Sequence, residues 1–356
     1  MTEKRVKSLQ SRLEKGQAAL IVSEANRFYL TGFHSSDGFV FVTADSADFF
    51  VDFRYCEMAK SAVSSCSVTL SQKPLDELRE LINKHSVKRM FVETATVSIA
   101  EFERYKAALD GVEIPSDSFL DNILCELRSQ KSRSEIEYIR EAQRMTDETF
   151  SYILGSIAAG RTEREIMLDM EFYMRRMGSE GVSFDFIVVS GKKSSLPHGV
   201  PSDKKIERGD FITMDFGAVV NGYRSDMTRT VAVGEISGEQ KRVYDTVLAA
   251  QNAAFSKIAP GVVCSDVDKA ARDLIDSAGY NGCFGHALGH SVGIEIHENP
   301  TFSPRCKTEL KEGMVITVEP GIYLENRFGV RIEDMICVTE SGFENLTKSE
   351  KNLIIL

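Results

Sequence analysis

The last two-thirds of the sequence repeats its own organisation, and this repeat limits the possible folds more than any other feature. Each copy reads as a helix, a second helix and then a series of strand-like segments. Corresponding landmarks keep nearly constant spacing: Ser132 and Ser237 are 105 residues apart, Thr162 and Ser265 are 103 apart, and Asp215 and Glu319 are 104 apart. We therefore predict a duplicated α+β domain with its functional site between the two halves.

The repeat is marked by residues that begin helices. A Ser or Thr followed three residues later by Glu or Gln forms a capping box, which satisfies free N–H groups at a helix start. Such pairs are Ser132 with Glu135, Thr162 with Glu165, and Ser237 with Gln240. A fourth helix is expected to begin near Ser265, so each copy has two helices ahead of its strands.

Residues 1 to about 125 have a different pattern. Short β-rich runs alternate with segments whose apolar residues recur at helical spacing. The predicted strands are AALIVS, GFVFVT, DFFVDF and RMFVET, and the predicted helices are LDELRELINKH and AEFERYKAAL. We expect a small α/β domain over residues 1–125, followed by the duplicated domain over residues 126–356.

Charge and composition argue against several classes of function. The formal net charge of -10 disfavours nucleic acid as a partner, because phosphate binding requires a basic face. No segment approaches the roughly 18 apolar residues of a membrane helix, and the N-terminus has no apolar core of a signal peptide. The seven cysteines are dispersed and form no CxxC pair, which is typical of reduced thiols in a cytoplasmic protein. A secreted chain with one unpaired thiol is the alternative.

The segment MDFGAVVNGYRSDMT predicts a β-ribbon that carries two aspartates. Residues 221–222, Asn-Gly, are a strong signal for a two-residue hairpin turn. With this turn, Asp215 lies opposite Thr228. Asp215 and Asp226 then project from the same face of the ribbon, with Cβ atoms roughly 6–8 Å apart.

Two interpretations of this ribbon are open. Both aspartates could be ordinary surface residues, or they could share a cation that offsets their repulsion. The flanking runs FITMDFG and TVAV are apolar on both faces, which indicates a buried ribbon. A buried carboxylate needs a partner or a metal ion, so we favour a metal site.

The second half of the repeat offers a matching acidic pair and a histidine. Glu319 ends the apolar run MVITVE and Glu333 lies within GVRIEDMICV, so four carboxylates would converge. About four negative charges balance two divalent cations, whereas a single Mg²⁺ uses only one or two carboxylates. His290 lies in LGHSVG, where small neighbours permit close approach to a metal. Carboxylates combined with an imidazole suit Mn²⁺, Co²⁺, Fe²⁺ or Zn²⁺.

These residues resemble the dinuclear metal site of the pita-bread metallopeptidases, the superfamily of methionine aminopeptidases and prolidases. The resemblance is carried by MDFGAVVNGYRSDMTRT, GHSVGIEIHENP, ITVEPGIY and GVRIEDM, in that order. It implies a metal-binding set of Asp215, Asp226, His290, Glu319 and Glu333. NRFYLTGF and VDFRYCEMA are similar to the N-terminal domain of Xaa-Pro aminopeptidases, prolidases and creatinases. The implied fold is an α/β N-terminal domain followed by an α+β pita-bread catalytic domain.

The resemblance also implies how the site works. Two divalent metal ions per subunit, with Mn²⁺ favoured over Co²⁺, Zn²⁺ or Fe²⁺, would activate a bridging hydroxide as the nucleophile. Glu319 would accept and relay its proton. His198, in LPHGVPSD, matches a substrate-contacting position, and His297 matches the residue that hydrogen-bonds the scissile carbonyl as charge develops.

Three further residues are expected near the site. His286 either lines the substrate pocket or supports a ligand, and the sequence leaves both roles open. Tyr223 and Arg331 lie next to ligands along the chain. Arg331 is expected to orient a carboxylate through an ion pair, with substrate binding as the alternative.

His290 and His297 lie seven residues apart, and both are expected in the site. On a straight strand, residues at this spacing project to opposite faces. A β-bulge would bring both side chains inward, and Gly289 and Gly293 would permit one.

The favoured function is a metal-dependent aminopeptidase that cleaves between an N-terminal residue and a following proline. The proline preference comes from the resemblance alone. The main alternative is a prolidase, which cleaves Xaa-Pro dipeptides and needs a cation for the free carboxylate of proline. Several prolidases place an arginine just after the position of His297, but here residues 298–301 are Glu-Asn-Pro-Thr and the next basic residue is Arg305. This absence favours the aminopeptidase.

A different class of function is a non-catalytic binding module on the same fold. It predicts little bound metal and no hydrolysis, but all five ligand positions are filled here. The expected partners are peptides with proline at the second position and, by resemblance, a second copy of the chain in a homodimer. Nucleic acid and membranes are not expected partners.

Overall fold

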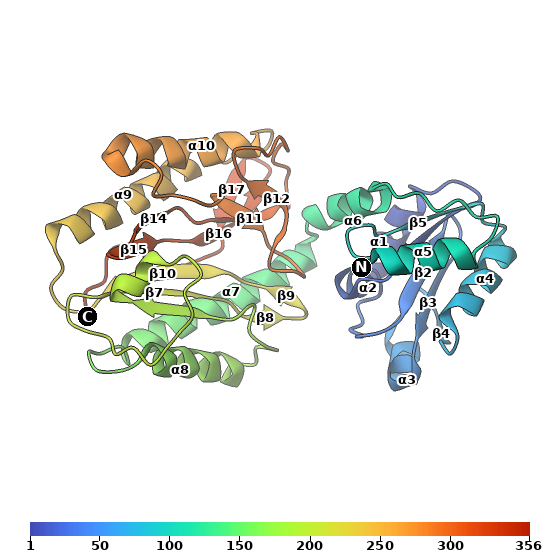
Figure 1. Ribbon diagram of the computed structural model, residues 1–356, viewed down its shortest axis with the longest axis horizontal. Helices are drawn as coiled ribbons and strands as arrows, with labels where there is room; N and C mark the ends of the chain where they lie inside the picture. The colour runs from blue at the N-terminus through green and yellow to red at the C-terminus, as the bar shows by residue number, and fades with distance from the viewer. The chain divides into compact units, whose positions relative to one another are not determined.

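The computed structural model describes all of residues 1–356 and divides them into two compact units, Met1–Arg128 and Ser129–Leu356. Each unit has its own sheets and its own hydrophobic core (Figure 1). None of the helices combines the length and apolar character that a bilayer-spanning segment requires. The assignment of residues 1–125 and 126–356 as separate folding domains stays a prediction.

The N-terminal unit is an α/β domain built on one mixed sheet. Its strands are β1 (Gln17–Ile21), β2 (Phe39–Thr43), β3 (Ala47–Val51), β4 (Ser67–Leu70) and β5 (Arg89–Val92). They have the order β4-β3-β2-β1-β5, with β1 antiparallel to β2 and parallel to β5. The helices are α1 (Thr2–Gln10), α2 (Glu24–Thr31), α3 (Phe53–Ala62), α4 (Pro74–His85), α5 (Ile99–Ala108) and α6 (Phe119–Ser129).

The four strands and two helices predicted for this region are confirmed. Leu20, Phe41 and Met90 from the sheet pack in one core with Leu78 and Leu81 of α4, which explains the helical spacing of those leucines. β4 has no comparable apolar run because it is an edge strand whose side chains are exposed or half-buried. Its sequence therefore gave no strand signal.

The C-terminal unit is a duplicated helix–helix–strands domain, as the repeat predicts. Its first half consists of α7 (Arg133–Leu154), α8 (Glu163–Arg176), β6 (Ile187–Ser190), the short 3₁₀ helix η1 (Gly191–Ser195), β7 (Phe211–Phe216), β8 (Val219–Val220), β9 (Tyr223–Arg224) and β10 (Met227–Ala232). The main sheet of this half has the order β10-β7-β6, and β8 pairs with β9 as a small ribbon.

The second half has the same order of elements. It consists of α9 (Gly238–Phe255), α10 (Cys264–Ile275), the helical turn η2 (Asp276–Tyr280), β11 (Gly289–Ser291), β12 (Glu298–Phe302), β13 (Val315–Val318), β14 (Gly321–Leu324), β15 (Phe328–Arg331), β16 (Asp334–Thr339) and β17 (Gly342–Asn345). One sheet has the order β12-β11-β13-β16-β17, and β14 pairs with β15. In Figure 1, α9 and α10 lie on one side of the strands of this unit, and α7 and α8 lie on the other.

The predicted capping boxes form at three of these helices. In each box the backbone N–H of the first residue donates to the side-chain oxygen three residues later, over 2.8 Å at Ser132, 2.7 Å at Thr162 and 2.9 Å at Ser237. The fourth helix, α10, begins at Cys264 after Val263, which has no side-chain cap. The start of α10 therefore lies one residue ahead of Ser265, and its first two N–H groups donate to the backbone carbonyls of Thr308 and Cys306 instead of to a side-chain cap.

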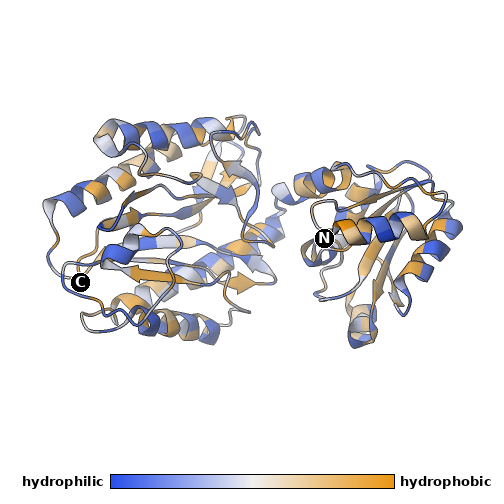
Figure 2. Cartoon of the chain, in the orientation of Figure 1, coloured by the Kyte–Doolittle hydropathy of each residue, from blue (hydrophilic) through white to orange (hydrophobic).

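Each half has a core between its helices and its strands. The first core includes Phe150 of α7 and Phe216 of β7. The second core includes Val247 of α9, and it also takes in Phe211 and Ala232 from the first half. Figure 2 shows hydrophobic residues gathered along the strands and hydrophilic residues in stripes along the helices.

Buried polar contacts also join the two halves. Arg229 of β10 is 1% exposed, and its Nη2 lies 2.7 Å from Asp334 Oδ1. Its Nη1 donates to the carbonyl oxygen of Glu333 at 2.6 Å, and the N–H of Glu333 donates to the carbonyl oxygen of Thr228 at 3.1 Å. Removing one partner of a buried ion pair costs about 3–5 kcal/mol, so each half stabilises the other.

We predict that residues 129–356 fold as one unit and that the second half does not fold alone. A fragment of residues 237–356 lacks Phe211 and Ala232 from its core and leaves Asp334 without Arg229. We expect this fragment to be unfolded or insoluble and the fragment 129–356 to melt cooperatively when followed by circular dichroism. A soluble 237–356 fragment with a cooperative melt would contradict the prediction.

Candidate metal centre

The first acidic ribbon has the register that the sequence predicts. β7 pairs with β10 so that Asp215 lies opposite Thr228, and the turn residues 221–222 have positive φ angles of 48° and 74°. Gly217 lies where the ribbon narrows, because a Cβ at this position would be 1.8 Å from the backbone oxygen of Ser225. The absence of a side chain lets the two arms approach closely beside Asp215.

The second acidic pair lies at strand ends. Glu319 directly follows β13, and its N–H donates to the carbonyl oxygen of Leu288 at 2.8 Å. Glu333 lies between β15 and β16, where its N–H is bonded to Thr228 of the first ribbon. Since Thr228 stands opposite Asp215, this contact brings the acidic residues of the two halves together.

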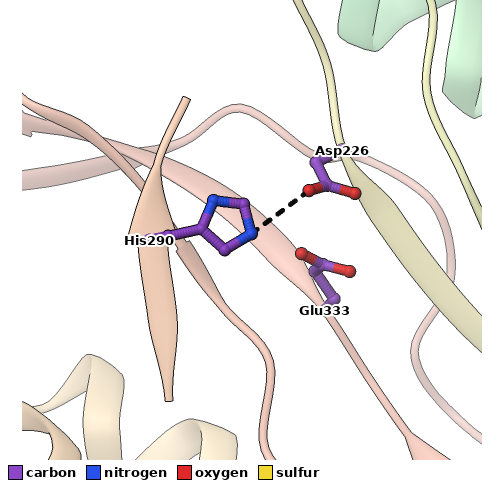
Figure 3. Close-up of side chains that lie close together, drawn as sticks. All are labelled: Asp226, His290 and Glu333. Carbon is purple, nitrogen blue, oxygen red and sulfur yellow. Dashed lines mark ion pairs between the residues drawn. The ribbon is translucent and has the colours of Figure 1, made fainter. Parts of the chain in front are cut away.

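One cavity of about 920 Å³ is lined by all five predicted ligand residues. Ligand atoms of Asp226, His290 and Glu333 lie within 4.8 Å of one another, and Figure 3 shows the three side chains converging. His290 Nε2 is 3.6 Å from Asp226 Oδ2 and 3.4 Å from Glu319 Oε1. Four carboxylates and one imidazole therefore face the same space.

Three carboxylate oxygens in this group have no hydrogen-bond partner. They are Asp215 Oδ1, Asp226 Oδ1 and Glu333 Oε1, and all are buried. Most buried polar side-chain atoms in proteins have a partner, so orphaned oxygens at one site call for an explanation. A divalent cation among them would supply it, and this donor set fits such an ion.

The electrostatics of the cavity also favour a bound cation. Burial and the neighbouring carboxylates raise the pKa of Asp226 and of Glu333 well above the ordinary range, and burial raises the pKa of Glu319 to about 8. Without a cation, these carboxyl groups cannot all be ionised at neutral pH. A bound divalent ion favours the ionised forms and removes the conflict.

His290 is neutral and presents one nitrogen to the carboxylates. Burial lowers the pKa of this residue to about 4. Nδ1 lies 3.2 Å from the carbonyl oxygen of Ser291, which assigns the ring proton to Nδ1. Nε2 then carries the free lone pair, which is the form of histidine that binds metals.

His297 reaches the cavity by a route that its spacing does not indicate. β11 ends one residue after His290, the chain turns back, and β12 begins at Glu298. The register shifts between His290 and Ser291, as the expected bulge requires, but the two histidines do not share one strand: His290 lies on β11, and His297 is the last residue of the turn before β12. Their ring centroids are 4.4 Å apart. Arg224 holds the turn by donating to two of its backbone carbonyls.

His286 lines the cavity and is also part of a hydrogen-bonded chain. Its Nδ1 lies 2.8 Å from the carbonyl oxygen of Ala287, and its Nε2 lies 2.9 Å from the hydroxyl of Tyr323. Tyr323 accepts a hydrogen bond from Arg331 Nη1 at 3.0 Å, and Arg331 Nη2 lies 2.6 Å from Asp215 Oδ2. Arg331 thus makes an ion pair with a carboxylate of the site. Sequence reasoning missed Tyr323, although it lies within ITVEPGIY.

The loop after β6 carries His198 to the cavity, and one buried carboxylate holds both ends of this loop. Glu163 Oε1 accepts from the N–H of Ser190 at 2.8 Å. Its Oε2 accepts from the N–H of Ser202 at 3.1 Å and from Lys193 Nζ at 2.6 Å. Sequence reasoning missed Glu163, because its partners lie 27 to 39 residues away along the chain.

Tyr223 does not line the cavity. Its hydroxyl donates to Glu135 Oε1 at 2.8 Å, and its ring centroid lies 5.8 Å from that of Tyr138. Tyr223 therefore anchors the ribbon to the first turns of α7.

Comparisons with known proteins agree with this architecture. The model of metallopeptidase family M24 matches residues 137–340, and that of the creatinase/prolidase N-terminal domain matches residues 5–129. The Xaa-Pro dipeptidase of Pyrococcus furiosus is 39% identical over 335 residues, which cover 94% of each protein. The solved Xaa-Pro dipeptidase from Bacillus anthracis has a TM-score of 0.96 and 39% identity, with 100% of both chains covered. The solved X-Pro aminopeptidase from Thermotoga maritima has a TM-score of 0.90 and 37% identity, covering 98% of this chain and 100% of that one.

We predict that Asp215→Asn and Glu333→Gln each lower metal affinity by roughly tenfold or more, because each removes a charged ligand. Activity should fall with metal content. Glu333→Gln should keep its fold because it removes mutual repulsion, whereas Asp215→Asn also takes the carboxylate partner from the buried Arg331 and should melt at a lower temperature. Metal per chain is measured by elemental analysis after dialysis, with melting followed in parallel. Asp245→Asn, which removes a charge from an exposed pair on α9, is the control and should change neither quantity. Full metal content and activity in the ligand variants would show that the assignment is wrong.

Proposed function

The chain belongs to metallopeptidase family M24, and from this membership we propose that it hydrolyses Xaa-Pro dipeptides with the help of divalent metal ions. The observation that carries the proposal is the single cavity in which four carboxylates and His290 face three further histidines, His198, His286 and His297. Such a cavity combines a site for cations with hydrogen-bond donors for a peptide carbonyl. A homodimer and a cytoplasmic location, both implied by the resemblance, stay predictions.

Relatives with a dipeptidase name favour the dipeptide over a longer substrate. Proteins named Xaa-Pro dipeptidase from two Pyrococcus species are 39% and 38% identical over 94% and 99% of this chain. The case for an aminopeptidase depends on one position, the missing arginine after His297, and we give it less weight than likeness over the whole chain. Because the chain is also similar to the X-Pro aminopeptidase from Thermotoga maritima, longer peptides with proline at the second position are the second candidate substrate.

The proposed mechanism divides the reaction among residues of the cavity. When bound, two divalent ions, with Mn²⁺ favoured, would offset the carboxylate charges and lower the pKa of water. Glu319 would hold the proton that the attacking water releases. His297 would donate a hydrogen bond to the carbonyl oxygen as negative charge develops there. His198 would also contact the substrate.

Charge and polarity would orient the dipeptide. The carboxylates attract the free amine, which places the first peptide bond at the metal site. Apolar side chains also line the cavity, among them Phe184, Ile187 and Val200. They suit the apolar ring of proline. The Xaa-Pro bond also has no N–H that would need a partner on this wall.

We predict that Xaa-Pro is cleaved with a higher kcat/KM than Xaa-Pro-Yaa, and that amidating the C-terminus of Xaa-Pro lowers kcat/KM. The reason is that a dipeptidase recognises the free C-terminal carboxylate of the proline. Product release from the three peptides measures the preference. Faster cleavage of tripeptides, with no loss on amidation, would favour the aminopeptidase. A metal-loaded chain that cleaves none of them would favour a non-catalytic binding module.

We also predict that His297→Ala lowers kcat by roughly two powers of ten, by analogy with the loss of an oxyanion donor. Metal content should hardly change, because His297 is not among the candidate ligands. Steady-state kinetics and elemental analysis on the same preparation check both expectations. A variant that turns over at the original rate, or that loses its metal, would count against this role.

A further inference from the structure

We propose that Arg164 binds the C-terminal carboxylate of the dipeptide, an inference that rests on the proposed function. A dipeptide places a carboxylate one residue beyond the bond that is cleaved, and selection for it requires a cation within reach. No basic residue follows His297 before Arg305, and Arg305 does not line the cavity. Thr301 does line it but is uncharged, and its hydroxyl lies 3.0 Å from Ser303 Oγ. The cation must come from another element.

Two arginines and no lysine line the cavity, and one of them is fully engaged. Arg331 is buried, and each nitrogen of its guanidinium already donates. Nε donates to Thr228 Oγ1 at 3.0 Å, Nη1 to Tyr323 and a backbone carbonyl, and Nη2 to Asp215. Turning it toward a substrate would leave Asp215 as a buried charge without its partner, which is strongly unfavourable.

Arg164, in the first turn of α8, is the uncommitted cation. Its Nε lies 2.9 Å from Asp203 Oδ1, while its two Nη groups have no hydrogen-bond partner in the protein. The side chain is 51% exposed. Its backbone N–H donates to the carbonyl oxygen of Ser202 at 3.1 Å, at the end of the loop that carries His198. The free guanidinium edge is therefore held beside the segment expected to contact substrate.

The acidic groups around Arg164 leave its charge available. Asp203 is 83% exposed, so water screens its attraction for the guanidinium. Glu171, further along the same face of α8, also lines the cavity but pairs with Arg175 at 2.9 Å. The neighbouring Glu163 is buried in its contacts with the loop. A substrate carboxylate that binds on this wall meets Arg164 as its favourable partner.

The chemistry of recognition makes the inference testable. A guanidinium can hold a carboxylate through two parallel hydrogen bonds, but it gains much less from a neutral amide. Arg164→Gln should therefore raise KM for Xaa-Pro by roughly five- to tenfold, less than for a buried pair because the site is half-exposed. kcat should change little. For the C-terminal amide of the same dipeptide, KM should hardly change. Arg164→Lys keeps the charge but cannot form the two parallel hydrogen bonds, so its KM for Xaa-Pro should lie between those of the original chain and Arg164→Gln.

A matched control is available on the same helix. Arg176→Gln removes an exposed arginine that neither lines the cavity nor pairs with an acidic residue of its wall, and it should leave KM for both substrates unchanged. Equal effects of Arg164→Gln on the dipeptide and its amide, or no effect on either, would overturn the inference. If the original chain cleaves no Xaa-Pro peptide, the proposed function fails instead. Calorimetric titration of the metal-loaded chain with Xaa-Pro and its amide then decides the role of Arg164 separately.

Discussion

Mutual repulsion among four enclosed carboxylates is the interaction on which the rest of the C-terminal unit depends. Asp215, Asp226, Glu319 and Glu333 face one cavity, and three of their oxygens have no hydrogen-bond partner. Burial alone would keep such groups protonated, as the raised pKa of Glu319, about 8, indicates. For these groups to be ionised, positive charge must therefore be supplied from nearby. Arg331 supplies one charge through its ion pair with Asp215, and divalent cations can supply the rest. The hydrogen bonds around the site make sense as a frame that holds these charges at fixed distances.

The duplicated architecture solves the problem of bringing the charges together. Each half contributes two carboxylates from strand ends, so the site forms where the halves meet and not within either. Close backbone approach is needed on both sides. A Cβ at Gly217 would lie 1.8 Å from the backbone oxygen of Ser225, and a Cβ at Gly289 would lie 1.9 Å from that of Thr317. Gly289 directly precedes His290, and Gly217 follows Asp215 by two residues, so the absence of side chains there controls the width of the site.

Local chemistry explains which features the sequence could predict. The register that places Asp215 opposite Thr228 follows from one hairpin turn and the alternation of a strand, and the capping boxes follow from residues three apart. The contacts that were missed join distant residues: Tyr323 meets His286 across 37 positions, and Glu163 meets Ser202 across 39. The hairpin between His290 and His297 was missed for a related reason. Its turn is fixed by Arg224, whose side chain gives no sign in the sequence of the carbonyls that it will bind. Roles of the individual site residues stay predictions.

The site separates groups that build it from groups that are free to recognise a ligand. Lys131, Arg229 and Arg331 are buried, and each is paired with a carboxylate: Glu298, Asp334 and Asp215 respectively. Exchanging such a partner would cost about 3–5 kcal/mol, so these cations cannot serve a substrate that comes and goes. The histidines divide in the same way. Burial lowers the pKa of His286 and of His290 to about 4, which keeps both rings neutral and bonded within the frame. His198 and His297 are exposed on the cavity wall. A half-exposed Arg164 belongs with this second group, because only side chains that water already reaches can exchange solvent for substrate at low cost.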